Sequence, residues 1–238
     1  MKKSVNDARK ALITSRAWQL YAILFPPIHS SPSMNALSKS VLFLLLFAIC
    51  SSLTNAADWP MWRYDAKRRA ASPEQLPDLI ELQWTLDLPQ REQVWDDPLN
   101  HDLMPYDRVF EPIVLGERIF LTFNDSDKVV AYQTSDGSES WRFYTDGPVR
   151  LPPVGHEGNI YVTSDDGFLY CLAADSGELK WKFRGGPGPL KVLGNKRLVS
   201  AWPARGGPVI RDGHVYFAAS IWPMMGTFIF SLDAETGA

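Results

Sequence analysis

The feature of this 238-residue chain that most limits its fold is a unit that returns about every 40 residues. Its clearest copy, at 165–181, reads DDGFLYCLAADSGELKW: an apolar run, a Gly turn and a Trp. A weaker copy at 128–141 reads KVVAYQTSDGSESW, and a third at 227–237 reads TFIFSLDAETG. Repeats of this length are typical of solenoids and propellers, in which each unit packs against its neighbours.

The interior of each copy predicts strands. In the second copy we expect four short strands, near 153–154, 159–164, 168–173 and 178–183. The third of these is apolar at every position, which indicates burial on both faces and therefore a sheet stacked on each side. Four-stranded antiparallel sheets that stack in this way form a β-propeller.

We therefore predict an all-β fold: an incomplete β-propeller of four-stranded antiparallel blades. It would contain about two and a half blades plus a lone closing strand, LQWTLDL at 82–88. Seven or eight blades need about 280–350 residues. We therefore expect the chain to be the N-terminal part of a longer protein, and a ring of several chains is the alternative.

The N-terminal residues resemble a secretory signal rather than part of the fold. In 34–56, Lys39 precedes the apolar run 41–50 and the small polar stretch SSLTNAA, with cleavage predicted between Ala56 and Ala57. The run is shorter than a bilayer span, so we expect no transmembrane helix in the mature chain. Residues 1–33 are then an upstream extension, or else an unusually long start to the signal.

This organisation predicts an exported protein, located in the periplasm or the cell envelope or secreted. An N-terminal arm at 57–81 would precede the propeller at 82–238. The formal net charge is −3, and the residues after 56 are net acidic. Nucleic-acid binding depends on neutralising phosphates, so we expect no nucleic-acid partner.

The repeat resembles that of pyrroloquinoline-quinone (PQQ)-like β-propellers. The pattern G-x-L-Y-x-L-x-A-x-[ST]-G-x-x-x-W at 167–181 carries the resemblance, and FSLDAETG at 230–237 matches it again. That family includes quinoprotein alcohol dehydrogenases and the propeller lipoprotein of the outer-membrane assembly machinery. The resemblance covers 82–238 and implies a structural role, the docking of neighbouring blades, for Gly137, Trp141, Gly177, Trp181 and Gly237.

A family likeness of this kind indicates the fold but leaves the function open. The longest insertions fall in loops that should share one face of the blades, where binding sites usually lie. The candidate residues in them are Trp95, His101, Trp202, Arg205, Trp222, Met224 and Met225. We interpret this face as a binding or scaffold surface for a protein or an extracellular polymer. Packing between blades is the alternative role for its apolar residues.

Enzyme activity is not favoured on this chain, and we expect no catalytic residues, metal or cofactor. The resemblance implies a vicinal Cys pair beside the quinone, whereas the two cysteines here, Cys50 and Cys171, are far apart in sequence. The alternative is the N-terminal part of a PQQ-dependent dehydrogenase that also binds Ca²⁺. Trp202 or Trp222 would then sandwich the quinone and Arg205 would pair with a carboxylate. The sensor portion of an envelope receptor is a third hypothesis.

Overall fold

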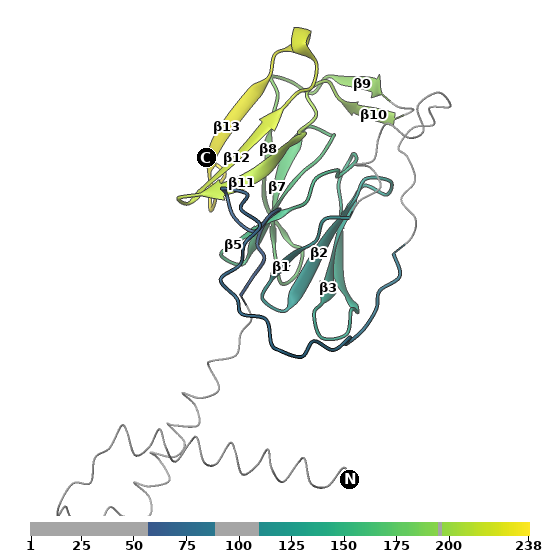
Figure 1. Ribbon diagram of the computed structural model, residues 1–238. Coiled ribbons are helices and arrows are strands. Elements are labelled where there is room, and N and C mark those ends of the chain that lie inside the picture. The colour runs from purple at the N-terminus through teal and green to yellow at the C-terminus, as the bar shows by residue number, and fades with distance from the viewer. Residues whose placement is uncertain (1–56, 89–109, 195–196) are drawn as a thin grey trace, which may run out of the picture. The chain divides into compact units, whose positions relative to one another are not determined.

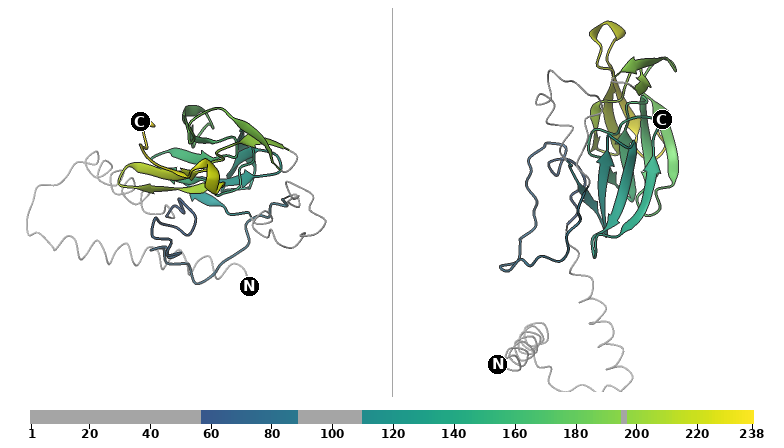
Figure 2. Two further views of the ribbon diagram at one scale, coloured as in Figure 1. Left: turned by 90° about the horizontal axis from the view of Figure 1, so that it is seen from above. Right: turned by 90° about the vertical axis from the view of Figure 1, so that its right-hand side faces the viewer.

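A computed structural model describes residues 57–88, 110–194 and 197–238. Its strands form three antiparallel sheets that stack side by side, and a separate hairpin (Figures 1 and 2). Blade 1 contains β1 (Ile113–Leu115), β2 (Arg118–Phe123), β3 (Lys128–Gln133) and β4 (Glu139–Tyr144). Blade 2 contains β5 (Val154–His156), β6 (Asn159–Thr163), β7 (Phe168–Ala173) and β8 (Leu179–Arg184).

Blade 3 has three strands among the described residues: β11 (Gly206–Arg211), β12 (His214–Ala219) and β13 (Phe228–Asp233). Within each blade, strands that are neighbours in the chain are also neighbours in the sheet. A short 3₁₀ turn, η2 (Pro223–Met225), lies in the loop between β12 and β13. The prediction of an incomplete propeller with four-stranded antiparallel blades is confirmed.

Two local predictions differ from the structure. The connection after blade 2 was expected to be a loop, but it contains a hairpin of β9 (Lys191–Gly194) and β10 (Arg197–Ser200). The segment 82–88, expected to be a lone closing strand, is unpaired among the described residues as expected, but it is not assigned as a strand. It contacts blade 1 through side chains instead: the Trp84 indole N–H donates to the Thr134 carbonyl, and Leu88 packs against Leu121 and Phe123.

The predicted burial of β7 on both faces is confirmed. Leu169 and Cys171 point into a cluster shared with blade 3, where they meet Val215 and Phe217. The alternate residue Leu172 joins a second cluster, shared with blade 1. Because successive side chains of a strand point to opposite faces, a fully apolar strand supplies both cores. Blade 2 is therefore the middle layer of the described fold.

The Gly turn before each fourth strand receives a Trp from the preceding layer. Gly177 has a positive φ of 73°, and a Cβ added there would lie 2.5 Å from Cε3 of Trp141. Gly237 receives Trp181 in the same way. Both the left-handed backbone and the close approach of the ring require the absence of a side chain.

The N-terminal arm lies against the inner strands of blades 1 and 2. Trp59 and Val114 exchange two backbone hydrogen bonds of 2.9 Å, and the Gly155 N–H donates to the Pro60 carbonyl at 2.6 Å. Met61 is buried in the cluster between blades 2 and 3. Figure 2 shows this dark-blue segment on one side of the sheets. Of the described segments, no helix has the length and apolar character needed to cross a membrane.

Candidate binding face

Five connecting segments meet at one end of the blades, which we call the loop face. They are the loops 124–127, 164–167 and 220–227, the connection 145–153, and the connection after blade 2, described at 185–194 and 197–205. Backbone hydrogen bonds join them: the Ser200 N–H donates to the Asp165 carbonyl at 2.8 Å, and the Asp165 N–H donates to the Pro148 carbonyl at 2.9 Å. The loop face is therefore cross-linked across blade boundaries.

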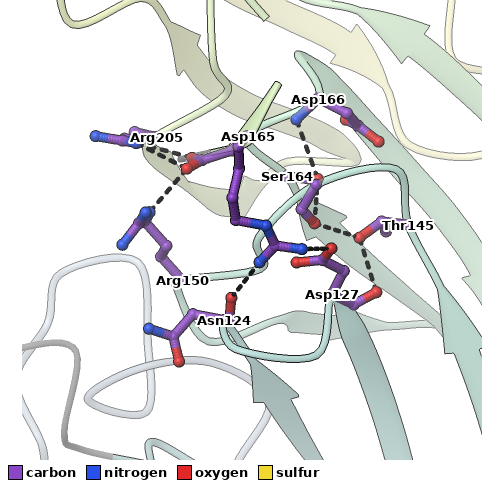
Figure 3. A network of polar contacts seen from close by, with 10 residues as sticks. Asn124, Asp127, Thr145, Arg150, Ser164, Asp165, Asp166 and Arg205 are labelled. Atoms are coloured by element: carbon purple, nitrogen blue, oxygen red, sulfur yellow. Dashed lines mark hydrogen bonds and ion pairs between the residues drawn. The ribbon is translucent and has the colours of Figure 1, made fainter. Parts of the chain in front are cut away.

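Asp165 is the centre of an ionic network on this face (Figure 3). Its side chain is only 1% exposed, and its two oxygens accept hydrogen bonds from Arg150 and Arg205. The Arg150 Nε–H donates at 2.8 Å, and Arg205 donates through two nitrogens, each at 2.7 Å. A buried carboxylate needs such partners because its desolvation is costly. The bidentate geometry also fixes the orientation of Arg205.

The adjacent Asp166 fastens the β6–β7 turn to the preceding connection. Its carboxylate accepts hydrogen bonds from the Phe168 N–H at 2.9 Å and from the Asp146 N–H at 3.1 Å. The Tyr170 hydroxyl donates a short hydrogen bond to the same carboxylate. Burial raises the pKa of Asp166, although these hydrogen bonds oppose the shift. Burial also raises the pKa of Tyr170, and the nearby Asp166 charge adds to that effect.

Arg197 ties the β9–β10 hairpin to blade 1. It projects from β10, donates to the Asn124 carbonyl at 3.3 Å and forms an ion pair with Asp127. Burial raises the pKa of Asp127, while the Arg197 charge opposes that shift. These contacts hold a hairpin that follows blade 2 against a loop of blade 1.

A cleft of about 610 Å³ lies next to this network, between the arm and the inner strands of blades 2 and 3. Its lining residues are Trp62, Arg68, Glu111, Arg150, Leu151, Pro152, Val154, Arg205, Gly207 and Pro208. The Arg68 guanidinium lies over the Trp62 ring and donates to the Trp62 carbonyl at 2.7 Å. Burial lowers the pKa of Arg68. The arm therefore forms one wall of the cleft.

The structure separates the predicted contact residues into two groups. Trp202 is half-buried; it packs beside Gly186, and its indole N–H donates to the Met225 carbonyl at 2.9 Å. Arg205 is engaged with Asp165. Trp202 and Arg205 therefore make contacts inside the loop face, whereas Trp222 is exposed and Met224 is 87% exposed.

Two other predicted contact residues, Trp95 and His101, lie outside the described residues. The described segments contain no group of three or more His, Cys, Asp or Glu residues placed to hold a metal ion.

The hairpin carries apolar residues that the sequence analysis did not select. Leu193 and Leu198 are cross-strand partners, and Leu193 is 76% exposed. Leu190, at the base of the hairpin, is also exposed. The available signal was two short apolar runs, Val192-Leu193 and Leu198-Val199, separated by a polar stretch that contains Gly194 and Asn195, residue types common in turns.

Stacked four-stranded blades joined by docked Trp residues, with an elaborated loop face, define a PQQ-like propeller. Comparison with protein families places residues 82–238 in the family described as outer membrane protein assembly factor BamB. The chain therefore belongs to this PQQ-like propeller-repeat family. A search of curated proteins gives no match.

Two solved quinohemoprotein alcohol dehydrogenases share this fold over most of the chain. Quinohemoprotein alcohol dehydrogenase ADHIIG from Pseudomonas putida HK5 matches at 19% identity and a TM-score of 0.53, over 76% of this chain and 25% of that protein. Quinohemoprotein alcohol dehydrogenase from Comamonas testosteroni matches at 19% identity and a TM-score of 0.51, over 80% of this chain and 28% of that protein. BamB from Moraxella catarrhalis matches at 20% identity and a TM-score of 0.42, over 53% of this chain and 37% of that protein. The chain thus spans about a quarter to two fifths of these proteins.

Proposed function

We propose that this chain is an exported binding module that docks a protein partner on its loop face. The observation that carries the proposal is the exposed Leu193–Leu198 pair on the β9–β10 hairpin. Exposed apolar clusters on a folded domain often mark interaction sites. The family name refers to outer membrane protein assembly, which supports a protein of the cell envelope as the partner.

The anchoring of the hairpin strengthens this proposal. Arg197 binds the Asn124 carbonyl and Asp127, and the Ala201 N–H donates to the Leu190 carbonyl at 2.9 Å. A surface held in place before binding loses little conformational entropy when the partner docks. The exposed side chains are mainly aliphatic, which suits an apolar protein surface better than an extracellular polymer.

Site-specific photo-cross-linking tests the proposal in cells that produce the protein. A photoreactive residue at Leu193 should give one discrete adduct with an envelope protein, and a second substitution, Leu198→Asp, should abolish it. A photoreactive residue at Leu79, which is equally exposed but lies in the arm, is the matched control. The proposal is wrong if positions 193 and 79 give the same adducts, or if Leu198→Asp leaves the adduct unchanged.

Two observations on the described residues favour the binding module over the alternative of a PQQ-dependent dehydrogenase. In the cleft, Arg150 and Arg205 are already paired with the buried Asp165. Cys171 is fully buried between blades 2 and 3, so it cannot contribute to a thiol pair facing the cleft. We therefore expect no bound-quinone absorbance when PQQ and Ca²⁺ are added to the chain. A saturable spectral change would instead favour the dehydrogenase.

A further inference from the structure

A second, smaller pocket lies at the base of the β9–β10 hairpin. Its volume is about 260 Å³, and its walls come from the start of β7, the end of β8, the connection after blade 1 and the two ends of the hairpin. Pockets that bind whole small molecules usually measure about 300–1,000 Å³. The size of this pocket therefore suits a single side chain or a small chemical group.

Three cationic side chains line the pocket: Lys182, Arg184 and Lys191. Lys182 and Arg184 project from β8 opposite Tyr170 and Phe168, so both lie on one face of blade 2. Lys182 Nζ is 4.8 Å and Arg184 Cζ is 4.5 Å from the centroid of the Phe168 ring. None of the three cations forms an ion pair with a carboxylate in the part of the chain that the structure describes. Their charges can therefore pair with a ligand.

Ser200 adds a buried hydrogen-bond donor to the same pocket. It is 4% exposed, and its Oγ accepts a hydrogen bond from the Trp202 N–H at 3.1 Å. A Cβ added at Gly167 would lie 2.5 Å from that oxygen, so the β6–β7 turn packs closely against it. A hydroxyl also has a hydrogen to donate, and no described residue accepts it. Ser200 can therefore donate to an oxygen atom of a ligand.

Two carboxylates in the lining, Asp146 and Asp166, limit the charge of that ligand. The oxygens of Asp166 already accept three hydrogen bonds, from the Phe168 and Asp146 N–H groups and from the Tyr170 hydroxyl. With both acids ionised, three cations and two carboxylates leave one net positive charge. A monoanion neutralises it, whereas a dianion leaves an excess negative charge and costs more to desolvate. The lining therefore favours a carboxylate over a phosphate.

We propose, building on the proposed function, that this pocket receives the carboxylate of an Asp or Glu side chain of the protein partner. Leu190 and Lys191, which line the pocket, belong to the base of the hairpin that carries Leu193 and Leu198. A partner segment with an acidic residue close to apolar ones would occupy both places at once. Hydrogen bonds from cations to a carboxylate are charge-assisted, so the acidic residue fixes the orientation of the segment on the leucines.

A titration of the purified chain with acetate tests the pocket without the partner. Sodium chloride is replaced by sodium acetate at constant ionic strength and pH, and the Trp202 amide resonance is followed by NMR, because this N–H binds Ser200. We expect a saturable shift. Lys182→Met with Lys191→Met should weaken acetate binding about tenfold, and both residues are exposed, so the fold is retained. Lys180→Met, exposed on β8 but outside the pocket, should change nothing. The absence of a saturable shift, or equal affinity in the double variant, overturns the proposal.

Photo-cross-linking from position 193 in cells tests the source of the carboxylate. The Lys182→Met and Lys191→Met pair should reduce the adduct about fivefold, and Lys180→Met should leave its yield unchanged. A full yield in the double variant refutes the pocket assignment while the proposed function stands. No discrete adduct at all refutes the proposed function, and saturable acetate binding would then indicate a site for a free carboxylate in place of a partner side chain.

Discussion

Replacing Gly177 by Ala should destabilise the fold by more than the strain of the turn alone. Gly177 has a φ of 73°, and a left-handed conformation costs a residue with a side chain about 1–2 kcal/mol. The new Cβ would also lie 2.5 Å from the Trp141 ring, and overpacking of this kind costs about 1–3 kcal/mol more. The expected loss of unfolding free energy is therefore about 2–5 kcal/mol.

Gly158→Ala is the matched control for this prediction. Gly158 has nearly the same φ, 75°, but an added Cβ meets nothing within 4 Å. Gly158→Ala should lower the free energy of unfolding only by the strain of the left-handed turn, about 1–2 kcal/mol. Urea unfolding followed by Trp fluorescence measures both variants. With a slope of at most about 3 kcal/mol per molar, the midpoint of Gly177→Ala should fall at least about 0.3 M below that of Gly158→Ala.

The reasoning fails if the two variants lose equal stability. Repeating the comparison in a second parent chain shows whether the Trp141 ring causes the extra loss of stability. In a chain with Trp141→Phe, the smaller ring leaves room for the new methyl group, so the difference between Gly177→Ala and Gly158→Ala should shrink. Such coupling is expected only between residues in contact. An undiminished difference would place the cause elsewhere in the turn.

Three further predictions concern buried polar groups and the thiol. Asp165→Asn should cost about 3–5 kcal/mol in urea unfolding, because Arg150 and Arg205 lose their shared charge; a loss below about 1 kcal/mol would contradict this. Burial raises the pKa of Asp166 from 3.8, so its stabilising contribution is complete at low pH and is lost as pH rises through the folded-state pKa. Asp166→Asn should therefore cost more at about pH 4 than at about pH 7, and the reverse order of unfolding free energies would refute the sign. Burial raises the pKa of Cys171 from 9.0 to about 11, which leaves roughly a hundredfold less thiolate near pH 8. With Cys50→Ser in place, a thiol reagent should label the chain only in denaturant, whereas rapid labelling of the native chain would be inconsistent with this burial.

The blades were predictable because the sequence pattern that specifies each one lies within about 40 consecutive residues. The apolar run at 168–173 indicates burial on both faces by itself, and β7 spans those same residues. The Gly turns and the Trp residues that follow them recur at fixed spacing, so comparing copies within one chain was enough to find the blades. The hairpin at 191–200 was missed because it occurs once and interrupts the repeat.

The loop face was not predictable because its contacts join residues that are distant in sequence. Arg205 reaches Asp165 across 40 positions, and Arg197 reaches Asp127 across 70. Nothing local distinguishes these arginines from solvated ones. Composition likewise could not distinguish Trp202, whose indole is engaged with Met225, from the exposed Trp222.

The residues that stabilise the blades are different from those proposed to bind a partner. The Trp–Gly contacts and the clusters between blades hold the layers together, and none of them involves Leu193 or Leu198. Arg197 connects the two systems, because it fixes the leucine-bearing hairpin to a loop of blade 1. Its contacts are partly exposed, so their loss should cost the fold little while detaching the hairpin from blade 1 and leaving only its backbone link to Asp165. The position of the hairpin, rather than the stability of the blades, is therefore what should determine whether a partner can dock.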